Sequence, residues 1–416
     1  MTNHPPLQNI HDLEKMLTER LPAYLEMLRQ MVEINSFTAN AEGVNRVGRL
    51  TADFFAPLGF EADFVPSERK DFGNHLFLQR SANQLSSPTI AMISHLDTVF
   101  SPQEEQANDF VWRPSGHRVY GPGCVDIKGG TVMIFMVLEA LKTYFPEVYH
   151  HTHWLICLNA SEEVLSQDFS QQCLERLPET TCGCLVFEAG NIQDNKFKLV
   201  VARKGRAYFR VEVEGKSAHA GNNHDAGANA IVQMAHTIQQ IASFTDYSRQ
   251  ITFNVGRVGG GTVVNRVPHY AEAEVEMRCF SPQVFTEGVN RMLALDGSSQ
   301  VSSTDGFPCT VSVQILERTM PWPINERTHQ LFQVWEQAAQ QLGMEVEMEK
   351  RGGLSDGNYL WDRFPTLDGL GPAGNNAHCS ESDPANGKDQ EYVSVSSFVP
   401  KALLNVTALL KLLGDG

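Results

Sequence analysis

The sequence has little basic charge and no hydrophobic run long enough to cross a bilayer. Lysine and arginine number 33 against 49 aspartates and glutamates, a formal net charge of −16. Nucleic acids and anionic membranes attract basic patches, so this balance argues against both as partners and leaves room for a cation. The longest apolar stretch, residues 131–141, contains Glu139 and is shorter than the roughly 20 residues of a membrane span. It predicts a buried helix.

Other common signatures are missing as well. The eight cysteines include no CxxC pair, and the first residues are polar, without the apolar core of a signal peptide. We therefore expect reduced thiols and a cytoplasmic location rather than a disulfide framework. Low-complexity segments and repeats are absent from the sequence. A hydrophobic content of 42% is ordinary for a globular protein, and a length of 416 residues favours two domains.

Apolar strands alternate with helical segments in the first half of the chain. Strand patterns cover residues 90–94, 154–158 and 185–187, and a helical pattern begins near Gly130. This alternation predicts an α/β fold with a mostly parallel sheet, in which ligands bind beyond the carboxyl ends of the strands. Ahead of it, apolar residues at three- and four-residue steps predict an N-terminal helical stretch, with Pro22 marking a break or restart.

The pattern changes near Gly205. Apolar and charged residues alternate along 209–214 and again along 270–279, as in antiparallel strands with one wet face. A helical pattern at 226–244 and a strand pattern at 251–258 lie between them. This βαββ-type block predicts an inserted α+β domain over residues 205–316. The α/β pattern then returns, so residues 1–204 and 317–416 are expected to form one discontinuous domain.

His95 and Asp97 stand where the strand at 90–94 ends. Side chains at positions i and i+2 of a strand share a face, so the two project together. A carboxylate beside an imidazole fixes its tautomer and raises its basicity, as in metal sites. The same pair also fits a purely structural contact at a strand end.

More acidic groups and a second histidine follow other predicted strands. They are Asp126 in a loop rich in glycine before the buried helix, Glu162 and Glu163 after the strand at 154–158, Glu188 after the strand at 185–187, and His378 in a glycine-dense loop. Taken alone, Asp126 fits a helix cap and the glutamate pair fits an exposed loop. Together these groups exceed the ligands that one tetrahedral zinc ion uses, and two metal ions sharing a bridging carboxylate account for the set.

A series of motifs across nearly the whole chain resembles a family of zinc peptidases and deacylases. This family includes carboxypeptidase G, acetylornithine deacetylase, succinyl-diaminopimelate desuccinylase and the zinc aminoacylases. The segments that carry the resemblance, in family order, are 94–100 (SHLDTVF), 120–130 (YGPGCVDIKGG), 161–163 (SEE), 187–188 (FE), 202–205 (ARKG), 217–221 (SAHAG), 265–268 (NRVP) and 371–378 (GPAGNNAH).

The resemblance implies a set of metal ligands. Asp126 would bridge two zinc ions in each subunit, with His95 and Glu188 completing one site and Glu163 and His378 the other. Manganese or cobalt could occupy the same ligands.

Further roles follow from the same resemblance. Asp97 would orient its neighbouring histidine, and Glu162 would be the general base that activates the metal-bridging water. The inserted block would be a dimerisation domain, from which His219 reaches the active site of the partner subunit in a homodimer. Asn265 and Arg278 would help to bind the carboxylate of the substrate. Without the resemblance, Arg278 fits a solvated strand face and His219 fits a turn.

The implied activity is that of a two-zinc amidohydrolase. It would cleave a C-terminal amino acid, with an acidic one as a candidate, from a small peptide or N-acyl conjugate. The segment Ser355-Asp356-Gly357-Asn358 favours this carboxypeptidase type, because the deacetylase and desuccinylase branches often have arginine at the position of Asn358. The alternatives are an N-acyl-amino-acid deacylase with the same mechanism and a catalytically inactive scaffold homologue.

One loop is longer than in the family that the sequence resembles, and one group of histidines lies outside the predicted site. The loop after His378 is longer than usual, so Glu381 and Glu391 both compete for the position of a family glutamate. We favour Glu391, with an insertion within residues 379–390. A separate group of histidines at 150, 151 and 153 has no site-like surroundings and is interpreted as a surface cluster.

Overall fold

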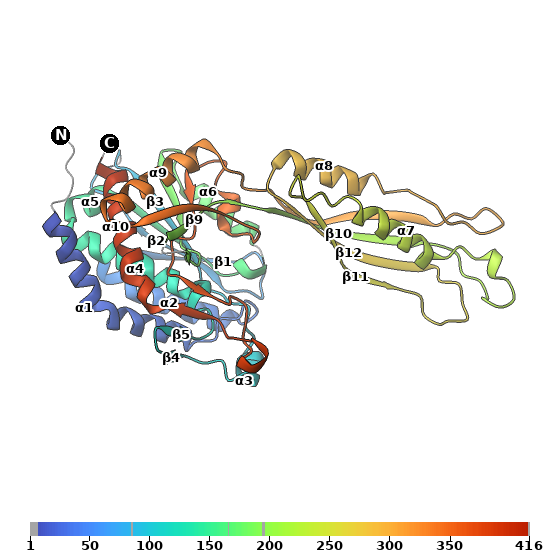
Figure 1. Cartoon of the computed structure of the whole chain (residues 1–416), viewed down its shortest axis with the longest axis horizontal. Helices are drawn as coiled ribbons and strands as arrows, with labels where there is room; N and C mark the ends of the chain where they lie inside the picture. The colour runs from blue at the N-terminus through green and yellow to red at the C-terminus, as the bar shows by residue number, and fades with distance from the viewer. Residues whose placement is uncertain (1–6, 85, 165, 194–195, 415–416) are drawn as a thin grey trace. The chain divides into compact units, whose positions relative to one another are not determined.

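A computed structural model describes residues 7–84, 86–164, 166–193 and 196–414 (Figure 1). The polar first six residues, on which the expected location partly rests, lie outside this part of the chain. The chain divides into two compact units. Unit 1 comprises Met1–Val201, Ile324–Glu349 and Ser355–Gly416, and unit 2 comprises Ala202–Pro323 and Lys350–Leu354.

Unit 1 is built on a six-stranded sheet in the order β1-β2-β6-β3-β7-β15. The strands are β1 (Glu61–Pro66), β2 (Asn74–Arg80), β3 (Thr89–His95), β6 (His153–Asn159), β7 (Thr181–Val186) and β15 (Thr366–Leu367). Strands β6, β3, β7 and β15 run parallel, whereas β2 is antiparallel to β6 and β1 is antiparallel to β2. The parallel part matches the predicted sheet, and β1 and β2 extend it at one edge.

Helices cover this sheet. They are α1 (Leu7–Val32), α2 (Ala41–Phe55), α3 (Pro102–Ala107), α4 (Gly129–Tyr144), α5 (Pro146–His151), α6 (Gln167–Arg176), α9 (Glu326–Gln341) and α10 (Phe398–Gly414). The predicted buried helix is α4, in which residues 129–138, Ala140 and Leu141 are buried. The predicted break at Pro22 is wrong, because α1 is continuous through it. Buried residues on both sides of the proline, among them Leu17 and Tyr24, hold both halves of α1 against the core.

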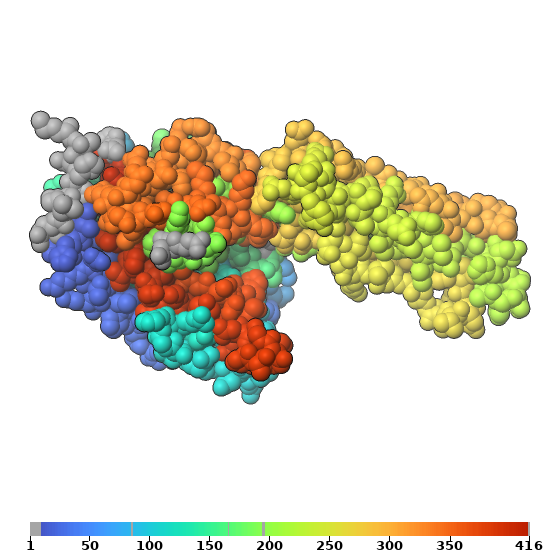
Figure 2. Space-filling view, viewed as in Figure 1, coloured from blue at the N-terminus to red at the C-terminus, as the bar shows by residue number. Residues whose placement is uncertain are grey.

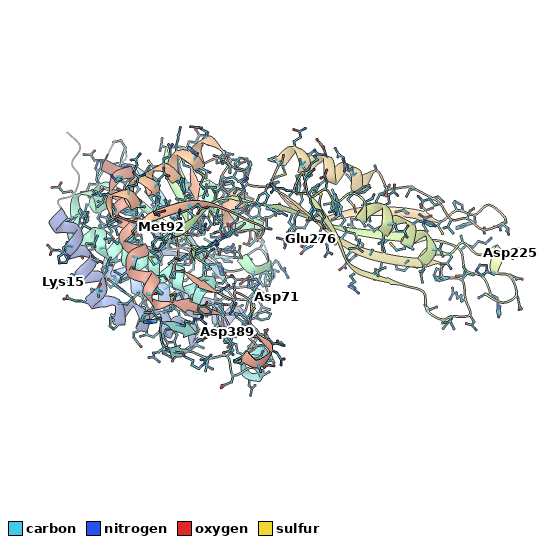
Figure 3. All side chains as sticks on the ribbon, in the orientation of Figure 1. Lys15, Asp71, Met92, Asp225, Glu276 and Asp389 are labelled. Carbon is cyan, nitrogen blue, oxygen red and sulfur yellow. The ribbon has the colours of Figure 1, made fainter. Side chains whose placement is uncertain are left out.

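The sheet has an apolar core on each face, as alternation along β3 shows. Ile90 and Met92 belong to the core that also contains residues of α1, α4 and α10, which lie side by side in Figure 1. Ala91 and Ile93 belong to a second core with residues of α6. Met92 is labelled in Figure 3. A strand buried on both faces produces the continuous apolar run seen in the sequence.

One helix of unit 1 is long and apolar enough to cross a membrane by length and composition alone. Among the described residues this helix is α10 with the residues before it, Val395–Gly414, and 61% of its most apolar 18-residue stretch is buried inside the structure. Core helices of globular proteins pass the same test. The packing of α10 against α1, α4 and α9 accounts for its apolar character.

Two smaller sheets hold the loops of unit 1. One has the order β16-β17-β5-β4 and the other β14-β9-β8. Their strands are β4 (Arg113–Ser115), β5 (Arg118–Tyr120), β8 (Asn191–Gln193), β9 (Lys196–Arg203), β14 (Glu345–Arg351), β16 (Gly374–Asn375) and β17 (Tyr392–Ser394). Because β17 pairs with β5, the loop after Tyr120 lies beside the chain leading into Tyr392.

Unit 2 is an α+β block with a four-stranded antiparallel sheet in the order β11-β12-β10-β13. Its elements are β10 (Gly205–Glu214), α7 (Ala230–Ala242), β11 (Thr252–Gly260), β12 (Tyr270–Cys279), α8 (Pro282–Leu293) and β13 (Thr310–Thr319). The predicted β-α-β-β order is present and is followed by α8 and β13. One face of the sheet packs with α7 and α8, and Phe209, Met234 and Phe285 share its core. None of the eight cysteines, all of which the structure describes, forms a disulfide.

Candidate metal centre

Three of the predicted ligands and the predicted base follow neighbouring parallel strands. β3 lies between β6 and β7, and His95 is the last residue of β3. The short helix η3 (Glu162–Val164) follows β6 and begins with Glu162 and Glu163, and Glu188 comes two residues after β7. Because the carboxyl ends of parallel strands meet at one edge of a sheet, the fold brings these side chains together.

Asp126 is placed over this edge by a tightly packed turn. It lies in η2 (Cys124–Lys128), which leads into α4, and the preceding Gly123 has φ +72°, a conformation that favours glycine. A Cβ on Gly130, in the first turn of α4, would lie 2.0 Å from the carbonyl oxygen of Phe187. The start of α4 therefore packs directly on the chain just after β7, and only glycine permits this approach.

The carboxylate of Asp126 lies between the two predicted histidine ligands. Its Oδ1 is 3.1 Å from Nε2 of His95, and its Oδ2 is 3.3 Å from Nε2 of His378. Nε2 of His378 is also 3.1 Å from Oε2 of Glu163. One ligand atom each from His95, Asp126 and Glu163 lies within 4.8 Å of the others. Imidazole nitrogens and carboxylate oxygens in such a cluster suit zinc and similar divalent ions.

Asp97 organises the neighbouring residues. It is fully buried, and its Oδ1 lies 3.4 Å from Nδ1 of His95. The same Nδ1 lies 3.0 Å from the carbonyl oxygen of Asp97, so it carries the proton and leaves Nε2 free as a ligand. Thr38 donates its hydroxyl to Oδ2 of Asp97 at 2.7 Å. The backbone N–H groups of Glu162 and Glu163 donate to the two oxygens of Asp97 at 3.1 and 3.3 Å.

The acidic groups of the cluster outnumber its two histidines. Burial raises the pKa of Glu163 to about 7, and the charge of Asp126 adds to this shift. Burial also raises the pKa of Glu162, and the charges of Glu188 and Asp356 raise it further. Hydrogen bonds to Asp126 and Glu163 raise the pKa of His378 to about 11. Buried like charges are costly, and a divalent cation would relieve this repulsion. The donor set therefore fits metal ions by its charge as well as its geometry.

The two glutamates that compete after His378 have different surroundings. Glu391 is fully buried, and its Oε1 accepts the N–H groups of Val125 and Asp126 at 2.9 and 3.2 Å. Its own N–H donates to the carbonyl of Cys379 at 2.7 Å, so it joins the Asp126 turn to the residue after His378. Glu381 instead forms an exposed ion pair with Lys388.

The long loop after His378 is fastened to α3. Asn108, at the end of α3, donates to the hydroxyl of Ser380 at 2.8 Å, and this hydroxyl donates to Glu104 at 2.6 Å. Figure 2 shows the loop at the surface beside the segment of α3, and Asp389 of this loop is labelled in Figure 3. His378 has a half-exposed side chain and φ +67°, so the surrounding contacts must hold it in place.

Asn159, which belongs to none of the motifs above, holds Asp356 near the cluster. Nδ2 of Asn159, at the end of β6, donates to Oδ1 of Asp356 at 3.0 Å, and both side chains are buried. Asn358 is buried too, and its side-chain oxygen accepts the N–H of Ser355 at 3.1 Å in a capping box. The residue that favoured the carboxypeptidase type therefore stabilises the turn that carries Asp356.

Known proteins are similar to this chain in sequence and in fold. Residues 201–294 match the peptidase dimerisation domain of the M20 peptidases. The chain is 26% identical over 404 residues to carboxypeptidase G2 of Pseudomonas sp. (strain RS-16), which covers 96% of this chain and 91% of that protein. The M20 family metallo-carboxypeptidase Sso-CP2 from Sulfolobus solfataricus has a TM-score of 0.69 at 15% identity, covering 94% of this chain and 99% of that one.

The chain is therefore similar to the M20 peptidases, in sequence over the dimerisation domain and in fold over nearly its whole length. A second solved structure, aminopeptidase PepT from Bacillus cereus, has a TM-score of 0.73 at 21% identity and covers 95% of this chain and 98% of that one. The protein is accordingly an enzyme of the metallopeptidase class, and its α/β domain carries an inserted block that matches a peptidase dimerisation domain.

The predicted substrate-binding residues all lie in unit 2. His219 and Asn265 are exposed on adjoining loops, where the carbonyl of Asn265 accepts the N–H of Ala220 at 3.0 Å. Nδ1 of His219 accepts the N–H of Gly221 at 3.1 Å. On β12, Arg278 donates through Nε to Glu276 at 2.5 Å.

Proposed function

We propose that this protein is a two-metal amidohydrolase that removes a C-terminal amino acid from a peptide or an N-acyl conjugate. The observation that carries the proposal is Asp126, whose two oxygens each face a different imidazole. A carboxylate in this position can ligate two cations at once. In the proposal, His95 and Glu188 complete one metal site, Glu163 and His378 complete the other, and zinc is the metal.

The proposed mechanism assigns proton transfer to Glu162. Metal ions held by these residues would lower the pKa of the attacking water and would stabilise the negative charge that develops on the scissile carbonyl. Glu162 accepts the proton of the attacking water and delivers it to the leaving nitrogen. The N–H of Glu162 donates to Asp97, and this hydrogen bond fixes the backbone from which the carboxylate of Glu162 extends. His219, supplied by the partner subunit of a homodimer, polarises the carbonyl from the other side.

The proposed substrate carries a free carboxylate beside the scissile bond. Arginine forms two parallel hydrogen bonds with carboxylates, and Arg278 with Asn265 would supply this recognition. The match to a carboxypeptidase over most of the chain supports cleavage at a C-terminal residue. An N-acyl-amino-acid deacylase would use the same ligands and base, so the acyl group must be found by experiment.

The proposal is tested by metal removal on a defined substrate panel. Activity is measured on peptides with C-terminal glutamate and on N-acetyl amino acids, with each assay run at a known zinc content. We expect hydrolysis of at least one group of substrates, its loss with a chelator and its return with zinc. Two bound metal ions per chain are expected by elemental analysis. Inactivity of fully zinc-loaded protein across the panel would instead support a scaffold homologue.

A further inference from the structure

The segment that leads into Glu162 is held by side chains at every step. Four successive backbone N–H groups, those of residues 160–163, each donate to a side-chain acceptor rather than to another backbone group. The pairs are Ala160 to Nδ1 of His75 at 3.1 Å, Ser161 to Oδ1 of Asn159 at 3.0 Å, Glu162 to Oδ1 of Asp97 at 3.1 Å, and Glu163 to Oδ2 of Asp97 at 3.3 Å. The last two acceptors belong to the metal centre, whereas His75 comes from β2.

His75 is in turn fixed by Asp168. The imidazole is fully buried, and since its Nδ1 accepts a hydrogen bond, its Nε2 carries the proton and donates to Oδ2 of Asp168 at 3.0 Å. That oxygen also accepts the hydroxyl of Ser67 at 3.0 Å and the N–H of Glu68 at 2.8 Å. The ring of Phe169 packs on the imidazole with the ring centres 5.3 Å apart. The orientation of His75 is therefore determined from both sides.

We propose that His75, oriented by Asp168, is a positioning residue for the base Glu162. This inference rests on the proposed role of Glu162. Ala160 lies two residues before the base, and its N–H is buried. Without the imidazole acceptor this N–H would be left unpaired, which is costly enough to make the segment move toward another acceptor. A base displaced in this way loses its alignment with the attacking water, and small displacements of this kind lower turnover strongly.

Two substitutions separate the two hydrogen bonds of the imidazole. In His75→Asn the side-chain oxygen occupies the place of Nδ1, so the acceptor for Ala160 is kept and the bond to Asp168 is lost. In His75→Gln the amide reaches the place of Nε2, so the bond to Asp168 is kept and the acceptor for Ala160 is lost. A role in packing alone predicts similar effects for both variants, whereas positioning of Glu162 predicts a large difference.

A matched control lies at the start of β6, the strand that leads into the segment 160–163. His153, the first residue of β6, accepts the N–H of Ala82 through Nδ1 at 3.0 Å and donates through Nε2 to the carbonyl of Gln84 at 2.9 Å. His153→Gln makes the same chemical change as His75→Gln, but at the end of β6 that lies away from Glu162. We expect it to leave kcat and KM unchanged.

The kinetic readout is the separation of kcat from KM in zinc-loaded protein. We expect His75→Gln to lower kcat at least about tenfold with KM within about twofold, the pattern of a misaligned catalytic group. His75→Asn should recover kcat to within about threefold of the parent enzyme. If His75→Gln does not fold, His75→Leu replaces it, because leucine fills similar space and offers Ala160 no acceptor, and the same fall in kcat relative to His75→Asn is expected. Equal kcat values for the two His75 variants would overturn the proposal.

A second readout does not depend on activity. Amide hydrogen exchange of residues 160–163 should be faster in His75→Gln and nearly unchanged in His75→Asn and His153→Gln. If the parent protein cleaves no substrate in the panel, the proposed function fails, but this exchange pattern would still support the hold of His75 on the segment. Unchanged exchange in His75→Gln overturns the positioning role whatever the activity shows.

Discussion

Asp97 performs several tasks with one side chain. It faces Nδ1 of His95, and its two oxygens accept the N–H groups of both glutamates that follow β6. A single buried carboxylate therefore couples the orientation of a predicted ligand to the position of the predicted base. The spacing of His95 and Asp97 in the sequence predicts their contact, but not the hydrogen bonds to a loop more than sixty residues away, because these depend on how the strands pair.

The first prediction concerns Glu162 itself. Glu162→Gln removes the group that accepts the proton but keeps its size, so kcat should fall at least about a hundredfold, as expected for a general base. Because Glu162 is not among the proposed ligands, two metal ions should remain bound by elemental analysis. Glu175→Gln, on the exposed face of α6, is the matched control and should behave as the parent enzyme. Near-normal turnover of Glu162→Gln would contradict the assignment.

Arg278 leads to a second prediction. Its Nε and Nη2 both donate to Glu276, which is labelled in Figure 3, and Nη1 donates to the carbonyl of Gly352 at 2.8 Å. A substrate carboxylate must therefore compete with Glu276. Glu276→Gln weakens this competitor, so KM for substrates with a free carboxylate should fall about threefold, as for a partly exposed ion pair.

The control for this change lies on the same strand. Glu274 pairs with Arg210 and Arg257 at longer distances of 3.7 and 3.6 Å, and Glu274→Gln should leave KM unaltered. A KM that stays the same in Glu276→Gln would argue that Arg278 does not bind the substrate carboxylate.

At the scale of elements, the end of β6 depends on a contact between β2 and α6. Asp168, in the first turn of α6, accepts hydrogen bonds from His75 of β2 and from the chain just after β1. Burial raises the pKa of Asp168. The hydrogen bonds from His75 and Glu68 outweigh this effect and hold that pKa well below its usual range. This carboxylate therefore stabilises the fold in its charged form.

The third prediction gives the sign of this effect. Because the folded pKa of Asp168 is lower than the unfolded one, its stabilisation is present above a pH of about 4 and is lost as the pH falls further. Asp168→Asn should lower the free energy of unfolding by about 1.5 kcal/mol at neutral pH, and the difference from the parent should shrink in acid. Urea unfolding at several pH values measures it. A difference that is constant across the pH range would show that the charge is not responsible.

The elements differ in how far the sequence predicts them. Strands β3, β6 and β7 are buried on both faces, so each produces an apolar run, and β12 has one wet face and alternates regularly. By contrast, β1 is mostly exposed, so its sequence has no clear period. The sequence shows the loop after His378 only as longer than is usual in the family that it resembles. Its attachment to α3 depends on side chains distant in sequence.

For the molecule as a whole, unit 2 is expected to supply a residue across a dimer interface. In the proposal His219 acts in the partner's active site, so a chain with His219→Ala should be rescued by a chain with Glu162→Gln. In randomly mixed dimers half of the molecules pair the two variants, and each of these has one complete site. About a quarter of the parent activity is then expected.

Each variant is also assayed alone for comparison. His219→Ala and Glu162→Gln should both be nearly inactive alone, and sedimentation should show that the mixture is dimeric. Absence of recovery in verified mixed dimers would argue against a role of His219 in trans.

The discontinuity of unit 1 has a consequence for the order in which the protein folds. Leu13 and Leu17 of α1 share a core with Leu403 and Leu404 of α10, whereas unit 2 is nearly contiguous in the chain. A ribosome makes the N-terminal part first, and domains generally fold as units during synthesis. Unit 2 can therefore be complete while the strands of unit 1 still lack a helix of their core. During this interval the newly made catalytic half exposes its apolar strands, and this is when it is most exposed to aggregation and most in need of chaperones.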